Sequence, residues 1–293
     1  MLQAVGSTVE FRDSLDDETD PGQLLFLDRA ARRAQPDAVD RFGVLDAVHK
    51  IVILGDTIED DDVVALLRRH RLDHVIADAD TPDEVELFVT SAKLLSGDIF
   101  GMEKYLAWGA RIRELEVTGY EEKRIALLTV AEHARRVGAR RPVVAKIESV
   151  TDELLMNAMY DAPAIRRGER PHARSPGAEA EGTALLRYGC DSRYFAVSVL
   201  DQYGELQKEA ILDHLSRARA ERGRPRRDDP NGGAGLGLYF ILSSVTRFIA
   251  NIRPGHLTEV VCLFDLRQSG RETDGCARSL HVFITPREET VED

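Results

Sequence analysis

The chain has 293 residues, of which 43% are hydrophobic, so it is long enough for two domains and apolar enough for a packed core in each. Its 39 basic and 51 acidic residues give a net charge of -12, which excludes a general nucleic-acid-coating role because acidic surfaces repel the phosphate backbone. The three cysteines have no CxxC spacing and support neither a disulfide framework nor a cysteine-rich zinc site.

The first third of the chain alternates apolar runs with helical patterns. Its predicted buried strands cover residues 24–28, 46–56 and 73–80. Helical periodicity is predicted for residues 60–72 and for 82–95, where Thr81 serves as N-cap and Pro82 as first helical residue. Continuous apolar strands between amphipathic helices favour a parallel sheet, so we expect a parallel α/β domain over residues 1–95.

The remaining two thirds predict a helical connector over residues 96–118 and a second domain over 119–293. The expected helices cover 120–137, 143–162 with a stop at Pro163, 205–219 and 235–249. The expected strands cover 184–190 and 193–201, which form a hairpin, and then 258–266 and 279–285. A glycine- and arginine-rich loop over 220–234 precedes the last helix.

No basic start followed by an apolar stretch marks a secretory signal, and no window approaches the roughly 18 apolar residues of a membrane span. The sequence therefore predicts a cytoplasmic protein with neither a membrane nor a nucleic-acid partner.

Glu153 and Asn157 form the first chemically informative pattern. Four residues apart on a helix, their side chains share one face. An Asn oxygen is a suitable Mg²⁺ ligand, and a Glu one turn away can accept a proton from water or a hydroxyl. The same spacing also arises by chance on many helices.

Asp201 ends a predicted strand and is followed by Gly204. A carboxylate in this place can accept a hydrogen bond from an exocyclic amine such as that of adenine, or it can be an ordinary turn residue. Further along, the glycine-rich stretch 231–238 leads directly into a helix. Glycines and a helix N-terminus together present backbone N–H groups to phosphate.

In this order and spacing, the three patterns resemble the N, G1 and G2 boxes of the GHKL ATPase superfamily, which includes gyrase-type, histidine-kinase and mismatch-repair ATPases. ELLMNAMYDAP resembles the N box, NGGAGLGLYFI the G2 box, and Thr258 the threonine of a late strand in that fold. The helix ALLTVAEHARRVG before the N box is most similar to the anti-sigma-factor type of serine kinase. The resemblance implies a Bergerat fold, an α/β two-layer sandwich in which helices back a mixed sheet, and it implies bound ATP and Mg²⁺.

By the same resemblance, Asn157 would ligate Mg²⁺, Glu153 would be the catalytic general base, and Asp201 would bind adenine. The full set of implied cofactor-binding residues is Asn157, Asp201, Gly204, Gly233, Gly235, Leu236, Gly237, Leu238 and Thr258. Two positions depart from the family pattern, because Gly204 stands three rather than two residues after Asp201 and Tyr160 replaces the basic residue of the histidine-kinase N box. Residues 216–234 would form a lid whose arginines either bind the γ-phosphate or face solvent.

The N-terminal domain resembles a truncated, degenerate response-regulator receiver, with Asp28 at the phosphoacceptor position. The acidic pair and the lysine that stabilise an aspartyl phosphate are missing, which favours an interaction-type receiver.

Together these features predict a signalling protein that binds ATP and Mg²⁺ and transfers the γ-phosphate to a Ser or Thr of a partner protein. Two alternatives stay open: a non-catalytic, ATP-dependent interaction switch, and a histidine-kinase-type phosphorelay component with His133 as the phosphoacceptor. The partner is an unidentified signalling protein, and a homodimer is also left open.

Overall fold

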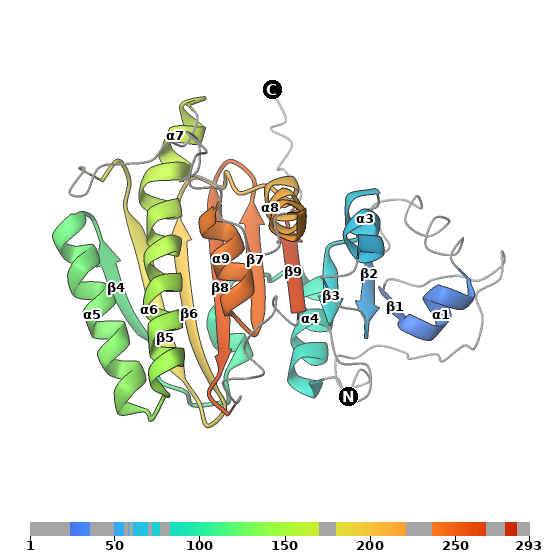
Figure 1. Ribbon diagram of the computed structural model, residues 1–293, viewed down its shortest axis with the longest axis horizontal. Helices are drawn as coiled ribbons and strands as arrows, with labels where there is room; N and C mark the ends of the chain where they lie inside the picture. Colours follow the sequence, from blue (N-terminus) through green and yellow to red (C-terminus); the bar gives the residue numbers. More distant parts are fainter. Residues whose placement is uncertain are drawn as a thin grey trace. The chain divides into compact units, whose positions relative to one another are not determined.

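The computed structural model describes residues 24–35, 50–55, 58, 61–69, 72–76, 83–169, 180–220, 236–267 and 279–285. The chain divides into two compact units, residues 1–99 with 278–283 and residues 100–277 with 284–293. Both units combine helices with a sheet, which confirms the predicted α/β class (Figure 1). In the described part of the chain, no helix has the length and apolar character needed to cross a bilayer.

The first unit contains three parallel strands. They are β1 (Leu24–Asp28), β2 (Lys50–Leu54) and β3 (His74–Ile76). Helices α1 (Arg29–Ala34), α3 (Asp61–Arg69) and α4 (Glu84–Ser96) alternate with them. The parallel order confirms the sequence prediction. A fourth strand, β9 (Ser279–Ile284), pairs antiparallel with β3 and was not expected in this sheet.

Helix α4 begins later than the sequence pattern predicts. Asp83, not Thr81, is its N-cap, and Asp83 Oδ1 accepts hydrogen bonds from the backbone N–H groups of Val85 at 3.0 Å and Glu86 at 3.4 Å. The predicted cap was wrong because an Asp carboxylate caps as well as Thr and also interacts favourably with the helix dipole.

The second unit is built on five strands in the order β7-β8-β6-β5-β4. They are β4 (Arg113–Val117), β5 (Ala184–Cys190), β6 (Tyr194–Asp201), β7 (Arg247–Arg253) and β8 (Leu257–Asp265), and each neighbouring pair is antiparallel. Helices α5 (Tyr120–Arg136), α6 (Arg141–Met156) and α9 (Leu236–Ser244) lie over one face of this sheet (Figure 1). Helix α8 (Lys208–Ala220) packs against α9.

Two strands of this sheet were missed by the sequence analysis. The predicted helix over 235–249 ends at Ser244, and Arg247–Arg253 forms β7 instead. A long apolar run fits a buried helix and a buried strand equally well, so periodicity could not locate the boundary. The connector holds a single 3-10 turn, η2 (Met102–Tyr105), and the edge strand β4, which is short and half polar.

The long helix expected to stop at Pro163 continues past it. Helix α6 passes into a π-helical turn, η3 (Asn157–Asp161), and then into α7 (Ala162–Arg166). Pro163 lies in the first turn of α7, where the missing N–H breaks no intrahelical bond. Because π-helical turns are frequent at functional sites, the turn that carries Asn157 is a candidate part of such a site.

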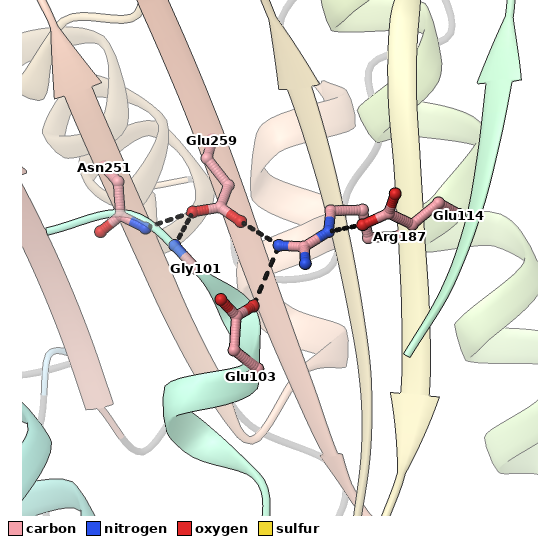
Figure 2. Close-up of polar contacts among 6 residues, drawn as sticks. All are labelled: Gly101, Glu103, Glu114, Arg187, Asn251 and Glu259. Carbon is pink, nitrogen blue, oxygen red and sulfur yellow. Dashed lines mark hydrogen bonds and ion pairs between the residues drawn. The ribbon is translucent and has the colours of Figure 1, made fainter. Parts of the chain in front are cut away.

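The opposite face of the five-stranded sheet holds a buried polar cluster (Figure 2). Glu259 on β8 is fully buried, and its Oε2 accepts hydrogen bonds from Gly101 N at 2.8 Å and from Asn251 Nδ2 at 2.9 Å. Arg187 on β5 lies 3.8 Å from Glu259 Oε1 and also binds Glu103 and Glu114. These bonds anchor the segment around Gly101 to this face of the sheet.

Candidate functional site

A cavity of about 220 Å³ lies in the second unit. Its lining residues come from α6, η3, α7, β6, the loop after β6, α8, α9 and β8: Leu154, Asn157, Ala158, Asp161, Ala162, Ile165, Val199, Asp201, Glu205, Leu206, Ala210, His214, Leu238, Thr258 and Val260. Most of these side chains are aliphatic, and a few polar groups stand among them. This composition is typical of small-molecule sites, in which apolar walls bind and polar groups orient.

The cavity brings together four residues that the sequence singled out: Asn157, Asp201, Leu238 and Thr258. The sheet register explains part of this. Asp201 on β6 lies directly opposite Thr258 on β8, so the two side chains project from the same face. Asn157 reaches the cavity from η3 and Leu238 from the first turn of α9.

Asp201 is 7% exposed, and its Oδ1 accepts hydrogen bonds from the backbone N–H groups of Tyr203 at 2.8 Å and Gly204 at 3.2 Å. Burial raises the pKa of Asp201 to about 6, against the opposing effect of those two N–H groups and of the Thr258 hydroxyl. The carboxylate is therefore held in a fixed orientation in a poorly solvated place. Such a combination is frequent at functional sites.

Gly204 supports Asp201 and does not line the cavity. Its φ is +66°, and a Cβ at this position would collide with the backbone of Arg253, Gly255 and His256. Its carbonyl accepts a hydrogen bond from Gly255 N at 3.1 Å. Only glycine fits here, because the loop after β6 packs directly on the β7–β8 turn.

Thr258 is 2% exposed, and its hydroxyl lies close enough to Asp201 to lower the pKa of that carboxyl but makes no well-formed hydrogen bond in the described part of the chain. Leaving a buried hydroxyl unpaired costs about 1–3 kcal/mol, so it calls for an explanation. A hydroxyl that lines a cavity beside a buried carboxylate is explained by a ligand that bonds to both.

Glu153 is not among the residues that line the cavity. A Cβ on Gly237 would collide with the Glu153 carboxylate, so α6 and α9 pack closely at this point. Burial, together with the negative charge of neighbouring Asp152, raises the pKa of Glu153 above its usual range. Lys123 lies 2.6 Å from Asp152 and offsets part of this effect.

Several predicted positions lie elsewhere or outside the described residues. Gly233, Gly235 and most of the expected lid fall in the part that the structure leaves undescribed, and Leu236 is placed only as the first residue of α9. Asp28 ends β1 and caps α1, where its Oδ1 accepts a hydrogen bond from Ala31 N at 2.7 Å. Its phosphorylation stays a prediction.

His133 lies on α5 and is half buried. Its Nε2 is 4.0 Å from Cys190 Sγ, and its ring contacts those of Tyr188 and Phe195. Burial, aided by the positive charges of Arg113 and Arg136, lowers the pKa of His133. These contacts are those of a packing residue, and its role as a phosphoacceptor stays a prediction.

Three titratable lining residues were missed by the sequence analysis: Asp161, Glu205 and His214. The spacing of Asp161, four residues after Asn157, was a signal that could have been used, since the π-helical turn brings both into the cavity. Glu205 also binds Arg166 Nη1 at 3.0 Å. Within the described ranges, no three His, Cys, Asp or Glu side chains are grouped so that they could hold a metal ion.

A scan against models of protein families and a search of curated proteins found no match to this chain.

Proposed function

We propose that the cavity of the second unit binds the base of ATP. The observation that carries this proposal is the pairing of Asp201 with Thr258 across β6 and β8, a buried carboxylate beside an unbonded hydroxyl in an apolar cavity. A 6-amino purine supplies the complementary groups, because its amino group donates and its ring nitrogen N1 accepts. Aliphatic side chains such as Val199 and Val260 offer a surface for the ring.

The residues present also suit the rest of a Mg²⁺-bound nucleotide. The Asn157 carboxamide lines the same cavity and offers the hard oxygen that Mg²⁺ prefers. Mg²⁺ bound to a nucleotide takes most of its ligands from phosphates and water, so a single protein oxygen is compatible with the absence of an acidic metal cluster among the described residues. The N-terminal turn of α9 is the expected place for the phosphates.

Phosphoryl transfer to a partner protein is the further step of this proposal, with Glu153 as the base that accepts the hydroxyl proton. Its raised pKa brings the carboxyl closer to the range of an effective base. The alternative is a switch that binds ATP and a signalling partner without turnover. Glu153→Gln separates the two, because an enzyme would lose γ-phosphate transfer or hydrolysis while ATP binding remains, whereas a switch has no turnover to lose.

ATP titration with and without Mg²⁺ tests the binding site. Asp201→Ala is expected to weaken ATP binding by about 100-fold, since it removes a buried charged acceptor. Asn157→Ala is expected to abolish the gain in affinity that Mg²⁺ provides and to leave metal-free binding intact. Asp191→Ala is the control, because Asp191 also accepts backbone N–H bonds, from Arg193, Tyr194 and Ala107, and lies at the other end of the β5–β6 hairpin, outside the cavity. Equal affinities for Asp201→Ala and Asp191→Ala, or no binding by the wild type, would refute the proposal.

A further inference from the structure

The two carboxylate oxygens of Asp201 are not equivalent. Both backbone N–H groups bond to Oδ1, and neither bonds to Oδ2. A proton on Oδ1 would face two donors, so protonation of Asp201 places the hydrogen on Oδ2. Protonation therefore converts the second oxygen from an acceptor into a donor while the backbone bonds that orient the side chain stay in place.

Resting on the proposed function, we propose that Asp201 selects the group at C6 of a bound purine and that its protonation switches the preference from a 6-amino to a 6-oxo base. The carboxylate accepts a hydrogen bond from an amino group and repels a carbonyl oxygen. The carboxylic acid, after taking one proton from solvent, donates to a carbonyl oxygen instead. The nucleotide class would thus be adenine above the pKa of Asp201 and hypoxanthine or guanine below it.

Thr258 permits both binding modes. Adenine N1 is an acceptor and hypoxanthine N1 carries a hydrogen, so a fixed donor or a fixed acceptor at this place would reject one of the two bases. A hydroxyl both donates and accepts, and the Thr258 hydroxyl, which lies beside Asp201 and lowers its pKa, makes no well-formed hydrogen bond in the described residues, so it can turn toward either base. Discrimination between the two bases is therefore left to Asp201.

The pKa of Asp201, about 6 because of burial, puts the switch within the pH range in which proteins are studied. Other titratable groups facing the cavity are Asp161 on η3, Glu205 in the loop after β6 and His214 on α8. The lining residues contributed by β8 and α9 are uncharged, and Arg166 pairs with Glu205 at the rim. Glu205 adds to the raised pKa of Asp201. The test must therefore distinguish the titration of Asp201 from the titration of each of these groups.

The test measures the affinities of ADP and inosine diphosphate between about pH 5 and pH 8 at constant Mg²⁺ and ionic strength. Phosphate titration affects both nucleotides equally, so the ratio of the two dissociation constants isolates the base. We expect the wild type to prefer ADP at high pH and the preference to fall by up to about tenfold per pH unit across this range, because ADP requires the carboxylate and inosine diphosphate requires the acid. Asp201→Asn, whose Nδ2 is a permanent donor, is expected to prefer inosine diphosphate with a ratio independent of pH.

Glu205→Gln and His214→Gln serve as controls, and each is expected to change the affinities or the midpoint while the ratio still depends on pH. A wild-type ratio that stays constant while ADP binds and Asp201→Ala weakens it overturns this inference and leaves the proposed function standing. A ratio that becomes constant in His214→Gln also overturns it, since the titrating group would then be the histidine. A wild type that binds neither nucleotide overturns the proposed function itself.

Discussion

Thr258 and Glu259 are neighbours on β8 and face opposite sides of the same sheet. Glu259, on the face crossed by the segment around Gly101, is fully buried, accepts hydrogen bonds from a backbone N–H and from Asn251, and forms an ion pair with Arg187 at 3.8 Å (Figure 2). Thr258, on the face covered by helices, is buried to a similar degree with no bond to its hydroxyl among the residues that the structure describes. The Glu259 carboxylate is thus held by protein donors, whereas Thr258 lines a cavity.

The comparison shows what distinguishes a structural polar group from a ligand-binding one. An unbonded hydroxyl alone is not sufficient, because Ser198 on β6 is also buried and unbonded in the described structure but does not line the cavity. Thr258 combines three features: burial, a free hydroxyl and a place beside Asp201 in the cavity lining. The energetic consequences of removing a group should therefore differ between the two faces.

The largest effect is expected for Glu259→Ala. Removing this carboxylate leaves Asn251, Gly101 N and part of the Arg187 charge without their acceptor, and breaking a buried charged pair typically costs about 3–5 kcal/mol. Urea unfolding followed by circular dichroism measures the loss.

Glu114→Ala is the control for that variant. Glu114 bonds to the same guanidinium but its side chain is 53% exposed, so its removal is expected to cost about 0–1 kcal/mol. Similar losses for the two variants would show that the buried cluster is not the stabilising element. If Glu259→Ala does not fold, Glu259→Gln, which keeps one acceptor, is expected to fold with an intermediate loss.

Asp201→Asn is expected to raise the free energy of unfolding, whereas Glu259→Ala lowers it. The folded-state pKa of Asp201 is about 6 and its ordinary value is 3.8, so the buried carboxylate destabilises the folded protein above pH 6. This penalty disappears as the pH falls from about 6 toward 4, because the carboxyl then folds in its neutral form. The amide should raise the free energy of unfolding at pH 7.5 by roughly 2 kcal/mol and by little at pH 4.5.

Chemical denaturation of the nucleotide-free protein at both pH values checks this prediction. An Asp201→Asn variant that is less stable than the wild type at pH 7.5 would mean that the carboxylate contributes to folding, as Glu259 does, and that the contrast between the two faces is false.

The elements that the sequence predicted correctly are those defined by local patterns. The amphipathic period of α5 and the apolar runs of β5 and β6 around the Asp191 turn are examples. Strand β9 could not be assigned to the first unit, because its pairing joins His281 with His74 across most of the chain. No local pattern carries such long-range information.

The candidate site was predictable only in part for the same reason. Residue spacing suggested Asn157 and Asp201, and the structure brings them into one cavity. The π-helical turn that adds Asp161 depends on packing around the end of α6, and His214 enters from a helix that carries no recognisable motif. Gly204 was predicted as a ligand residue, whereas its positive φ and its backbone contacts place it in support of Asp201.

The smallest effect on stability is expected for Thr258→Val, which keeps the shape of the side chain and removes the unbonded hydroxyl. With no bond to lose among the described residues, the free energy of unfolding should stay equal or rise by up to about 1 kcal/mol. Affinity for ADP should fall about tenfold, the loss expected for one buried hydrogen bond to a ligand. Isothermal titration calorimetry and urea unfolding of the same preparation give both numbers.

Ser198→Ala is the matched control, because it also removes a buried, unbonded hydroxyl from the sheet but from outside the cavity lining. Both variants should be at least as stable as the wild type, and only Thr258→Val should lose affinity. Loss of affinity in both would point to a general effect of the sheet, and loss in neither would leave the free hydroxyl of Thr258 without the ligand that explains it. Comparing the two variants therefore tests whether its position in the cavity, and not only its unbonded hydroxyl, makes Thr258 a binding residue.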